Sequence, residues 1–156
     1  MSRWAIVLLL LGHLAWAADG AAAFNATAEQ ALETMCATAT SLKVDGAAAV
    51  AWIPAPAKPG QAIASWTSRM RVAGAFVGKN TNVLGVVYTK MAEMADTLQD
   101  SGSKVRPPLR GEYGYQGGLI APVNGGYLLA AFSGGWDLRV AKAGLDVLVQ
   151  AQAPKP

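Results

Sequence analysis

The sequence predicts an α+β fold in which helices cover an antiparallel sheet, with the element order α-β-β-α-β-β-α. Three segments carry apolar residues at every third or fourth position, which is typical of amphipathic helices. Between them lie two pairs of strand-length apolar segments, each pair joined by residues rich in proline or glycine. Strands joined by short turns run antiparallel, and the helices are then expected to pack across the faces of the sheet.

Residues 1–17 are predicted to be a signal peptide. Arg3 precedes the apolar run AIVLLLLGHL, and Ala15-Trp16-Ala17 gives the small-x-small pattern of a cleavage site before Ala18. The alternative is an uncleaved anchor, although the run is shorter than the roughly 20 residues that span a bilayer. Cleavage predicts a periplasmic or secreted chain without a membrane span, with a disordered start at 18–26, one domain at 27–151 and a tail at 152–156.

The composition argues against several classes of function. Without Arg3, 12 basic residues face 10 acidic ones, and no basic cluster is interleaved with aromatic residues, so nucleic-acid binding is not expected. The single histidine, His13, lies in the predicted signal peptide, so the mature chain lacks the residue that catalytic triads and most zinc sites use. The single cysteine, Cys36, cannot form an intrachain disulfide, and burial on a helix is favoured over a crosslink between chains.

The first half of the mature chain contains one helix and two strands. Thr27 is the expected N-cap of the helix, with Gln30 as its capping-box partner. The apolar stripe of that helix comprises Ala28, Ala31, Leu32, Met35, Cys36, Ala39 and Leu42. Residues 47–54 form a short apolar run suited to a buried strand, and residues 61–70 are predicted to be the return strand, with Trp66 on one face.

A second helix is expected to begin near Thr81 or Asn82 and to end before residues 101–103. Its polar face is predicted to carry Lys90, Glu93, Asp96 and Gln99. The following segment, 104–116, is basic and contains two prolines, two glycines and two tyrosines, so it is predicted to be an irregular loop.

Three Gly-Gly pairs lie in the stretch GGLIAPVNGGYLLAAFSGG, residues 117–135. Such glycines either bind a phosphate or shape turns. Asn124-Gly125 between two apolar strands indicates a hairpin with a type I′ turn, and the last pair precedes a third helix beginning at WD. A phosphate loop would instead run directly into a helix with a lysine partner. Structural roles are therefore favoured, and the apolar hairpin is expected to be covered on both faces, by a helix and by a second subunit.

Several segments resemble the GlcG/HbpS-like haem-binding family, which also occurs as the C-terminal domain of PduO-type proteins. AVAWIPA and SWTSRMRVAGA are similar to its first two strands, and YTKMAEMA is similar to its lysine-containing helix. The glycine-flanked hairpin followed by SGG and Asp137 is similar to its most specific motif. Met91 and Glu93 depart from the family's usual alanine and threonine. The resemblance covers residues 27–150 and implies a profilin-like fold, oligomers, and binding of haem or a related small ligand.

Haem binding, if the resemblance holds, requires iron ligands and cationic partners for the propionates. Tyrosinate and thioether groups are accepted haem ligands; the candidates are Tyr88, Met91, Met94, Tyr113 and Tyr115. Arginines bind carboxylates well; the candidates, expected to flank the same surface, are Arg69, Arg71, Arg106 and Arg110. The alternatives are that the methionines and Tyr88 belong to the core and that Arg106 and Arg110 are solvated.

Two further groups have a structural and a chemical interpretation. Glu93, Asp96 and Asp100 follow one helix face at spacings of three and four, which suits either a hard cation or, preferentially, a solvated surface. Lys90 is expected to pair with Glu93 or Asp96 as a surface contact.

Two functions remain in competition. The first is an exported, oligomeric module that binds haem or another small ligand, accessory to a sensor or redox system. The alternative is a non-enzymatic assembly partner without a cofactor, and an enzyme ranks last because no acid-base pair demands one. An apolar fraction of 53% exceeds what a small sheet with three helices covers easily, so a homo-oligomer or a periplasmic protein partner is expected.

Overall fold

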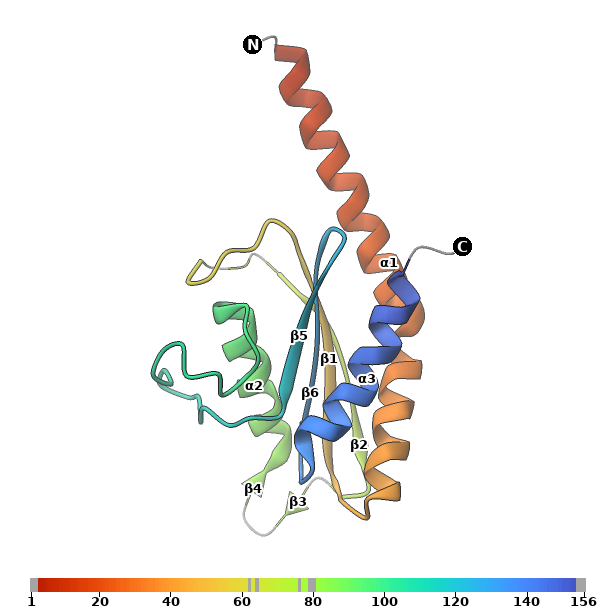
Figure 1. The fold of residues 1–156 in the computed structure, drawn as a ribbon, viewed down its shortest axis with the longest axis vertical. Coiled ribbons are helices and arrows are strands. Elements are labelled where there is room, and N and C mark those ends of the chain that lie inside the picture. Colours follow the sequence, from red (N-terminus) through yellow and green to blue (C-terminus); the bar gives the residue numbers. More distant parts are fainter. Residues whose placement is uncertain (1–2, 62, 64, 76, 79–80, 154–156) are drawn as a thin grey trace.

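A computed structural model of the chain describes residues 3–61, 63, 65–75, 77–78 and 81–153. It has the predicted α+β class and the predicted order of helices and main strands (Figure 1). The elements are α1 (Arg3–Ser41), β1 (Gly46–Pro54), β2 (Thr67–Ala73), β3 (Val77–Gly78), β4 (Thr81–Asn82), α2 (Val83–Thr97), β5 (Gly118–Val123), β6 (Gly126–Ser133) and α3 (Asp137–Gln152). Within the described residues, no helix combines the length and the apolar character needed to cross a membrane.

The four main strands form one antiparallel sheet in the order β2-β1-β6-β5. The two predicted strand pairs are both present, since β1 pairs with β2 and β5 pairs with β6. The long central strands β1 and β6 join the two pairs, with Val50 opposite Ala130 near the middle of the sheet. β3 and β4, of two residues each, form a separate two-stranded antiparallel sheet just before α2.

Helices cover both faces of the sheet, α1 and α3 on one side and α2 on the other (Figure 1). Side chains alternate along a strand, so each central strand contributes to two cores. The α1–α3 core receives Ala48, Val50, Trp52, Leu128, Ala130 and Phe132. The α2 core receives Ala47, Ala49, Ala51, Ile53, Leu129 and Ala131. The apolar hairpin is therefore covered on both faces within a single chain.

α1 begins earlier than the sequence predicts. Residues 18–26, expected to be disordered, are helical, and Thr27 is not an N-cap but lies inside the helix, where its hydroxyl donates to the Ala23 carbonyl. The physical reason is that Phe24 is fully buried in the α1–α3 core, which extends the packed part of the helix by a full turn. Gly20 lies still further back and contacts the Trp52 ring, where a Cβ would come within 2.5 Å of two ring carbons.

Cys36 lies on α1 and packs, partly buried, against the α1–α3 core. Burial raises the pKa of its thiol, which the positive charge of Arg71 only partly offsets. A thiol with a raised pKa forms less of the reactive thiolate.

Two local expectations needed correction. β2 begins at Thr67, whereas residues 61, 63, 65 and 66 precede it as irregular chain; residues 62 and 64 of the predicted strand lie outside the described residues. In the β5–β6 turn only Gly125 has a positive φ, of 84°, and Asn124 does not. A type I′ turn needs positive φ at both central residues, so this hairpin uses another turn type.

Candidate functional site

Residues 104–116, here called the tyrosine loop, are irregular, as predicted, and Arg106 anchors them. Its Nε donates to Asp96 Oδ2 on α2 at 2.7 Å, and its two terminal nitrogens donate to the Glu112 carboxylate at 2.7 and 2.9 Å. Bidentate pairing of this kind fixes orientation as well as distance. Arg106 was predicted as a partner for a ligand carboxylate; in the structure its guanidinium is engaged by two carboxylates of the chain itself.

Glu112 closes the loop on itself. Its Oε2 also accepts the Leu109 backbone N–H at 2.8 Å, and the Glu112 N–H donates to the Leu109 carbonyl at 3.0 Å. The hydrogen bonds from Arg106 hold the pKa of the Glu112 carboxyl below its usual value against the opposing effect of burial. The same contacts raise the pKa of Arg106, so both groups are charged at neutral pH.

Three carboxylates on and after α2 fasten the entry to the tyrosine loop and the start of β5. Glu93 is buried and accepts the Gly102 N–H at 2.9 Å, while Asp100 accepts the Ile120 N–H at 2.9 Å. Asp96 holds Arg106. Each carboxylate is turned to a different partner. Asp100 is exposed, as a solvated face would require, but Glu93 is buried, and the described residues contain no cluster of metal ligands.

The anchored loop presents its two tyrosines to solvent. The rings of Tyr113 and Tyr115 are stacked, with centroids 5.3 Å apart and planes inclined by 13°. Their exposed fractions are 56% and 54%. Gly114, which lies between the two tyrosines, has a φ of 63°. The two aromatic rings therefore lie side by side on the same side of the loop.

These tyrosines line a hollow of about 390 Å³, here called the tyrosine cleft, between the loop and the first turns of α2. Its other lining residues are Thr81, Asn82, Gly85, Val86, Thr89 and Gly111. The volume lies within the range of roughly 300–1,000 Å³ typical of small-molecule sites. The described lining combines hydroxyl and amide groups with aromatic faces and no charged side chain, which suits the flat, largely apolar part of a planar ligand.

Of the predicted iron ligands, the loop tyrosines are the ones that the structure exposes to solvent. Met91 and Met94 are fully buried in the α2 core, and Tyr88 is half-buried against it and does not line the cleft. The apolar periodicity of α2 points these three residues at the sheet, as the core interpretation of the sequence allowed.

The predicted cations do not share one surface. Arg69 and Arg71 alternate with Met70 on β2, and Met70 packs on the α2 side, so the two arginines face α1. Arg69 donates to Asn25 Oδ1 at 3.0 Å, and Arg71 pairs with Glu29 and Glu33. Arg110, by contrast, is exposed in the tyrosine loop next to Gly111 of the cleft.

Haem can therefore be tested against the residues present. Phenol oxygens are suitable ligands for iron, and the exposed Arg110 is an available cation for a propionate. The set fits haem through Tyr113 or Tyr115 with Arg110. It does not fit ligation by Met91 or Tyr88, or charge pairing by Arg69.

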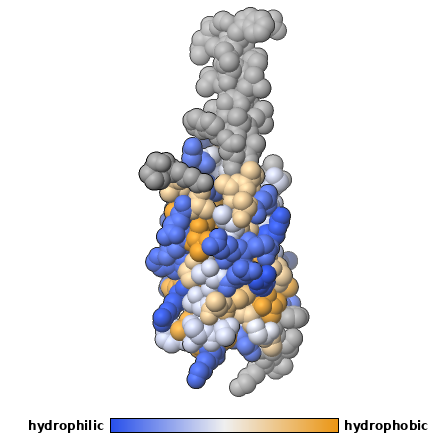
Figure 2. All heavy atoms as spheres, turned by 90° about the vertical axis from the view of Figure 1, so that its right-hand side faces the viewer, coloured by the Kyte–Doolittle hydropathy of each residue, from blue (hydrophilic) through white to orange (hydrophobic). Residues whose placement is uncertain are grey.

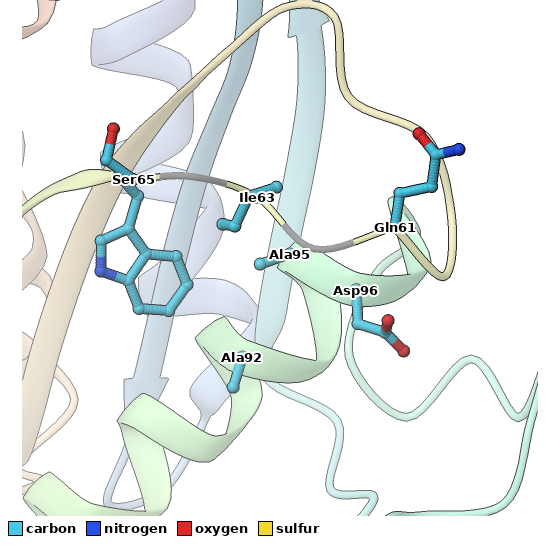
Figure 3. A pocket seen from close by; sticks show the side chains of 7 residues that line it. Gln61, Ile63, Ser65, Ala92, Ala95 and Asp96 are labelled. Carbon is cyan, nitrogen blue, oxygen red and sulfur yellow. The ribbon is translucent and has the colours of Figure 1, made fainter.

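A second hollow, of about 470 Å³, lies between the chain before β2 and α2 (Figure 3). Ile63 lies over Ala95, while the polar ends of Gln61, Ser65 and Asp96 point away from the space. The Asp96 carboxylate is already bound by Arg106. Because polar groups do not converge on it, this hollow offers less specificity than the tyrosine cleft.

Sequence reasoning missed a buried ion pair between α2 and α3. Lys90, predicted as a surface partner of Glu93 or Asp96, is only 1% exposed. Its Nζ donates to Asp137 Oδ2 at 2.6 Å and to the Phe132 carbonyl at the end of β6 at 2.7 Å. Gly117, with a φ of 119°, leaves room for the amine, since a Cβ there would lie 2.7 Å from Nζ.

Burial lowers the pKa of Lys90, and the hydrogen bond and charge of Asp137 only partly offset this effect. The other oxygen of Asp137 accepts the N–H groups of Gly134 at 3.1 Å and Gly135 at 2.7 Å. The glycine amides that could have held a phosphate are thus satisfied by the chain's own carboxylate. The lysine in α2 and the acid after SGG were visible in the sequence, but only long-range contacts bring them together.

No model of a protein family, no curated protein and no solved structure matches the chain.

Proposed function

We propose that this protein is an exported small-ligand-binding protein and that the tyrosine cleft binds a planar ligand, with haem as the first candidate. The observation that carries the proposal is the stacked, solvent-exposed pair Tyr113 and Tyr115 on the rim of the cleft. Aromatic rings offer a planar molecule a large contact area together with a polar hydroxyl group.

The rigidity of the loop supports this proposal. Arg106 and Glu112 hold the tyrosine loop against α2 through charged hydrogen bonds, so little freedom is left to lose when a ligand binds. An exposed aromatic pair on an anchored loop is more consistent with recognition than with packing, because it contributes little to the core.

Bound haem would supply a Lewis-acidic iron centre, and the chain's own residues would hold it. Tyr113 or Tyr115 would provide a phenol oxygen, Arg110 would pair with a propionate, and Thr81, Asn82 and Thr89 would line the opposite wall. The resemblance to GlcG/HbpS-like proteins points to the same ligand class.

Export is proposed on the basis of residues 1–17. Gly20 lies against the Trp52 ring and Ala21 packs on the α1–α3 core, so cleavage before Ala18 would keep both contacts. In Figure 1 the N-terminal part of α1 extends beyond the rest of the fold. Mass spectrometry of protein released into the periplasm or medium should give a chain that starts at Ala18; a chain starting at Met1 would contradict export by cleavage.

Haemin titration of the exported protein tests the ligand. We expect a Soret band that saturates at one haem per chain. The affinity for haemin should be at least tenfold lower in the Tyr113→Phe/Tyr115→Phe variant. Tyr127→Phe, outside the cleft, is the matched control and should bind as the parent does. Unchanged haem affinity in the double variant, or no Soret shift in the parent, would refute haem binding at the cleft.

A second function, as an assembly partner, is favoured by one specific observation. The tyrosine loop also exposes Val105 and Leu109, so most of its large apolar side chains face solvent. The outer face of α1 and α3 shows hydrophilic side chains with separate apolar patches between them (Figure 2). Sedimentation should therefore reveal an oligomer in the parent that Leu109→Asp weakens; a parent that is monomeric at micromolar concentration would leave only the binding function.

A further inference from the structure

We propose a second binding site, for a neutral oligosaccharide, at the end of the sheet where β6 leads into α3. The hollow there measures about 1010 Å³ and lies between the turn after α1, the start of α2 and Trp136. It is called the Trp136 groove and is lined by Lys43, Val44, Asp45, Thr81, Val83, Ser133, Gly134, Gly135, Trp136 and Asp137.

Trp136 is held in an unusual way for a tryptophan. Its φ is 54°, in the left-handed region, and its side chain is 62% exposed. Bulky residues are outliers in this region, whereas glycine and asparagine adopt it readily. The indole caps no helix N–H and has no described core to pack in, so folding alone does not account for a tryptophan at this position.

Ser133 lies in the same groove. Ser133 is only 6% exposed, and its hydroxyl makes no hydrogen bond with any described residue. Phe132 points into the α1–α3 core, so strand alternation directs Ser133 to the opposite face, where the groove opens. The Ser133 hydroxyl can donate and accept, so it is available to a ligand hydroxyl in the groove.

Charges of both signs stand at the rim. Among the described residues, neither Lys43 nor Asp45 takes part in an ion pair. Asp45 can accept hydrogen bonds, Lys43 can donate them, and the hydroxyls of Thr81 and Ser133 can do both.

This chemistry selects the class of ligand. A phosphate is disfavoured because Asp137 already occupies the amides of Gly134 and Gly135. A purely apolar ligand would leave the rim groups unsatisfied. A pyranose has a flat C–H face that can lie on the Trp136 indole, surrounded by hydroxyls that both donate and accept, which matches the mixed rim.

The size of the groove favours a chain of sugars over a single one. Its volume is at the upper end of the range of roughly 300–1,000 Å³ found for small-molecule sites. Several sugar units would span from Trp136 toward Lys43 and Asp45 on the facing turn.

Calorimetric titration of the exported protein with cellotetraose, maltotetraose and chitotetraose tests the proposal. We expect at least one of these neutral tetrasaccharides to bind, and Trp136→Asn to weaken that binding at least tenfold. Asparagine suits a positive φ, so this variant should melt at the same temperature as the parent or higher, which separates lost binding from lost folding.

Two controls make the result specific to the groove. Trp66→Phe removes an indole outside it and should bind the tetrasaccharide as the parent does, whereas Ser133→Ala should weaken binding severalfold. Trp136→Asn should bind haemin like the parent, which keeps this site independent of the tyrosine cleft. Absence of binding by all three tetrasaccharides, or equal binding by Trp136→Asn, would overturn the proposal.

Discussion

Lys90 is a cation held almost wholly out of water by three elements of the fold. It joins α2 to the carbonyl at the end of β6 and to the first residue of α3. A buried charge is tolerated only when it is paired and hydrogen-bonded, and Asp137 meets that need while also binding two glycine amides. The acid therefore links the lysine to the turn that starts α3.

Removal of the amine should destabilise the domain. In Lys90→Met, the Asp137 carboxylate and the Phe132 carbonyl lose their donor, and loss of one partner of a buried pair costs about 3 kcal/mol. Denaturant unfolding should show this loss of free energy. Asp137→Asn added to Lys90→Met should recover part of it, because the amide oxygen still accepts from the glycines while the uncompensated charge is gone; no recovery would contradict the ion pair as the cause.

The lowered pKa of Lys90 makes a prediction for alkaline pH. The unfolded chain then binds more protons than the folded one between the lowered folded pKa and the usual value of about 10.5. The free energy of unfolding of the parent should accordingly rise, relative to that of Lys90→Met, as the pH increases through this window. Denaturation curves of both proteins at a series of alkaline pH values measure the difference, and a falling difference would mean that attraction by Asp137 outweighs burial.

Individual residues also mark the limit of prediction from sequence. Helical spacing correctly placed Met91 and Met94 on the apolar face of α2, because that depends on local geometry alone. The same spacing put Lys90 and Glu93 in solvent, whereas both are buried by partners 47 and 9 residues further along the chain. Such contacts between distant residues leave no periodic trace in a sequence.

The tyrosine loop shows how an element without regular structure is kept in one conformation. Arg106 connects α2 to the tip of the loop, and Glu112 connects the tip to the Leu109 backbone. The aromatic pair beyond it depends on this anchor for its position.

Acid should release the tyrosine loop. The pKa of Glu112 is lowered in the folded protein, so its contribution to stability is complete above the usual value of about 4.5 and is lost as pH falls through the folded value. The protection factor of the Leu109 amide, which corrects its exchange rate for the intrinsic pH dependence of exchange, should therefore fall at low pH, and Glu112→Gln should lower it already at neutral pH. Asp146→Asn, which breaks an exposed pair with Lys142, is the control and should leave this amide unchanged.

Whether a segment forms a helix or a strand was easier to predict than the residue at which it begins or ends. The strand pairs and α2 follow from apolar runs and turns. The expected start of α2 near Thr81 or Asn82 is confirmed, and the structure adds that the Asn82 side chain accepts the Gly85 N–H as an N-cap. The start of α1 was placed too late because Phe24 appears isolated in the sequence, and only the α1–α3 core shows that it is buried. The fold class could be predicted because every local pattern agreed with it.

The molecule consists of a sheet enclosed by helices, and the two hollows proposed as binding sites lie at different places on its surface. The tyrosine cleft lies beside the start of α2, and the Trp136 groove lies at the end of the sheet, with Thr81 lining both. Neither hollow requires a residue of the predicted signal peptide, so the binding functions proposed here belong to the mature domain.

The extent of the mature domain can be tested by truncation. A chain starting at Ala18 should unfold at the same denaturant concentration as the full chain, because it keeps the core contacts of Gly20, Ala21 and Phe24. A chain starting at Ala28 loses Phe24, and removal of a buried phenylalanine ring costs about 3–5 kcal/mol. The Phe24→Ala variant of the chain starting at Ala18 is the matched control and should account for most of that loss. Equal stability of the chains starting at Ala18 and Ala28 would show that residues 18–27 contribute nothing to the domain, as a disordered mature N-terminus would require.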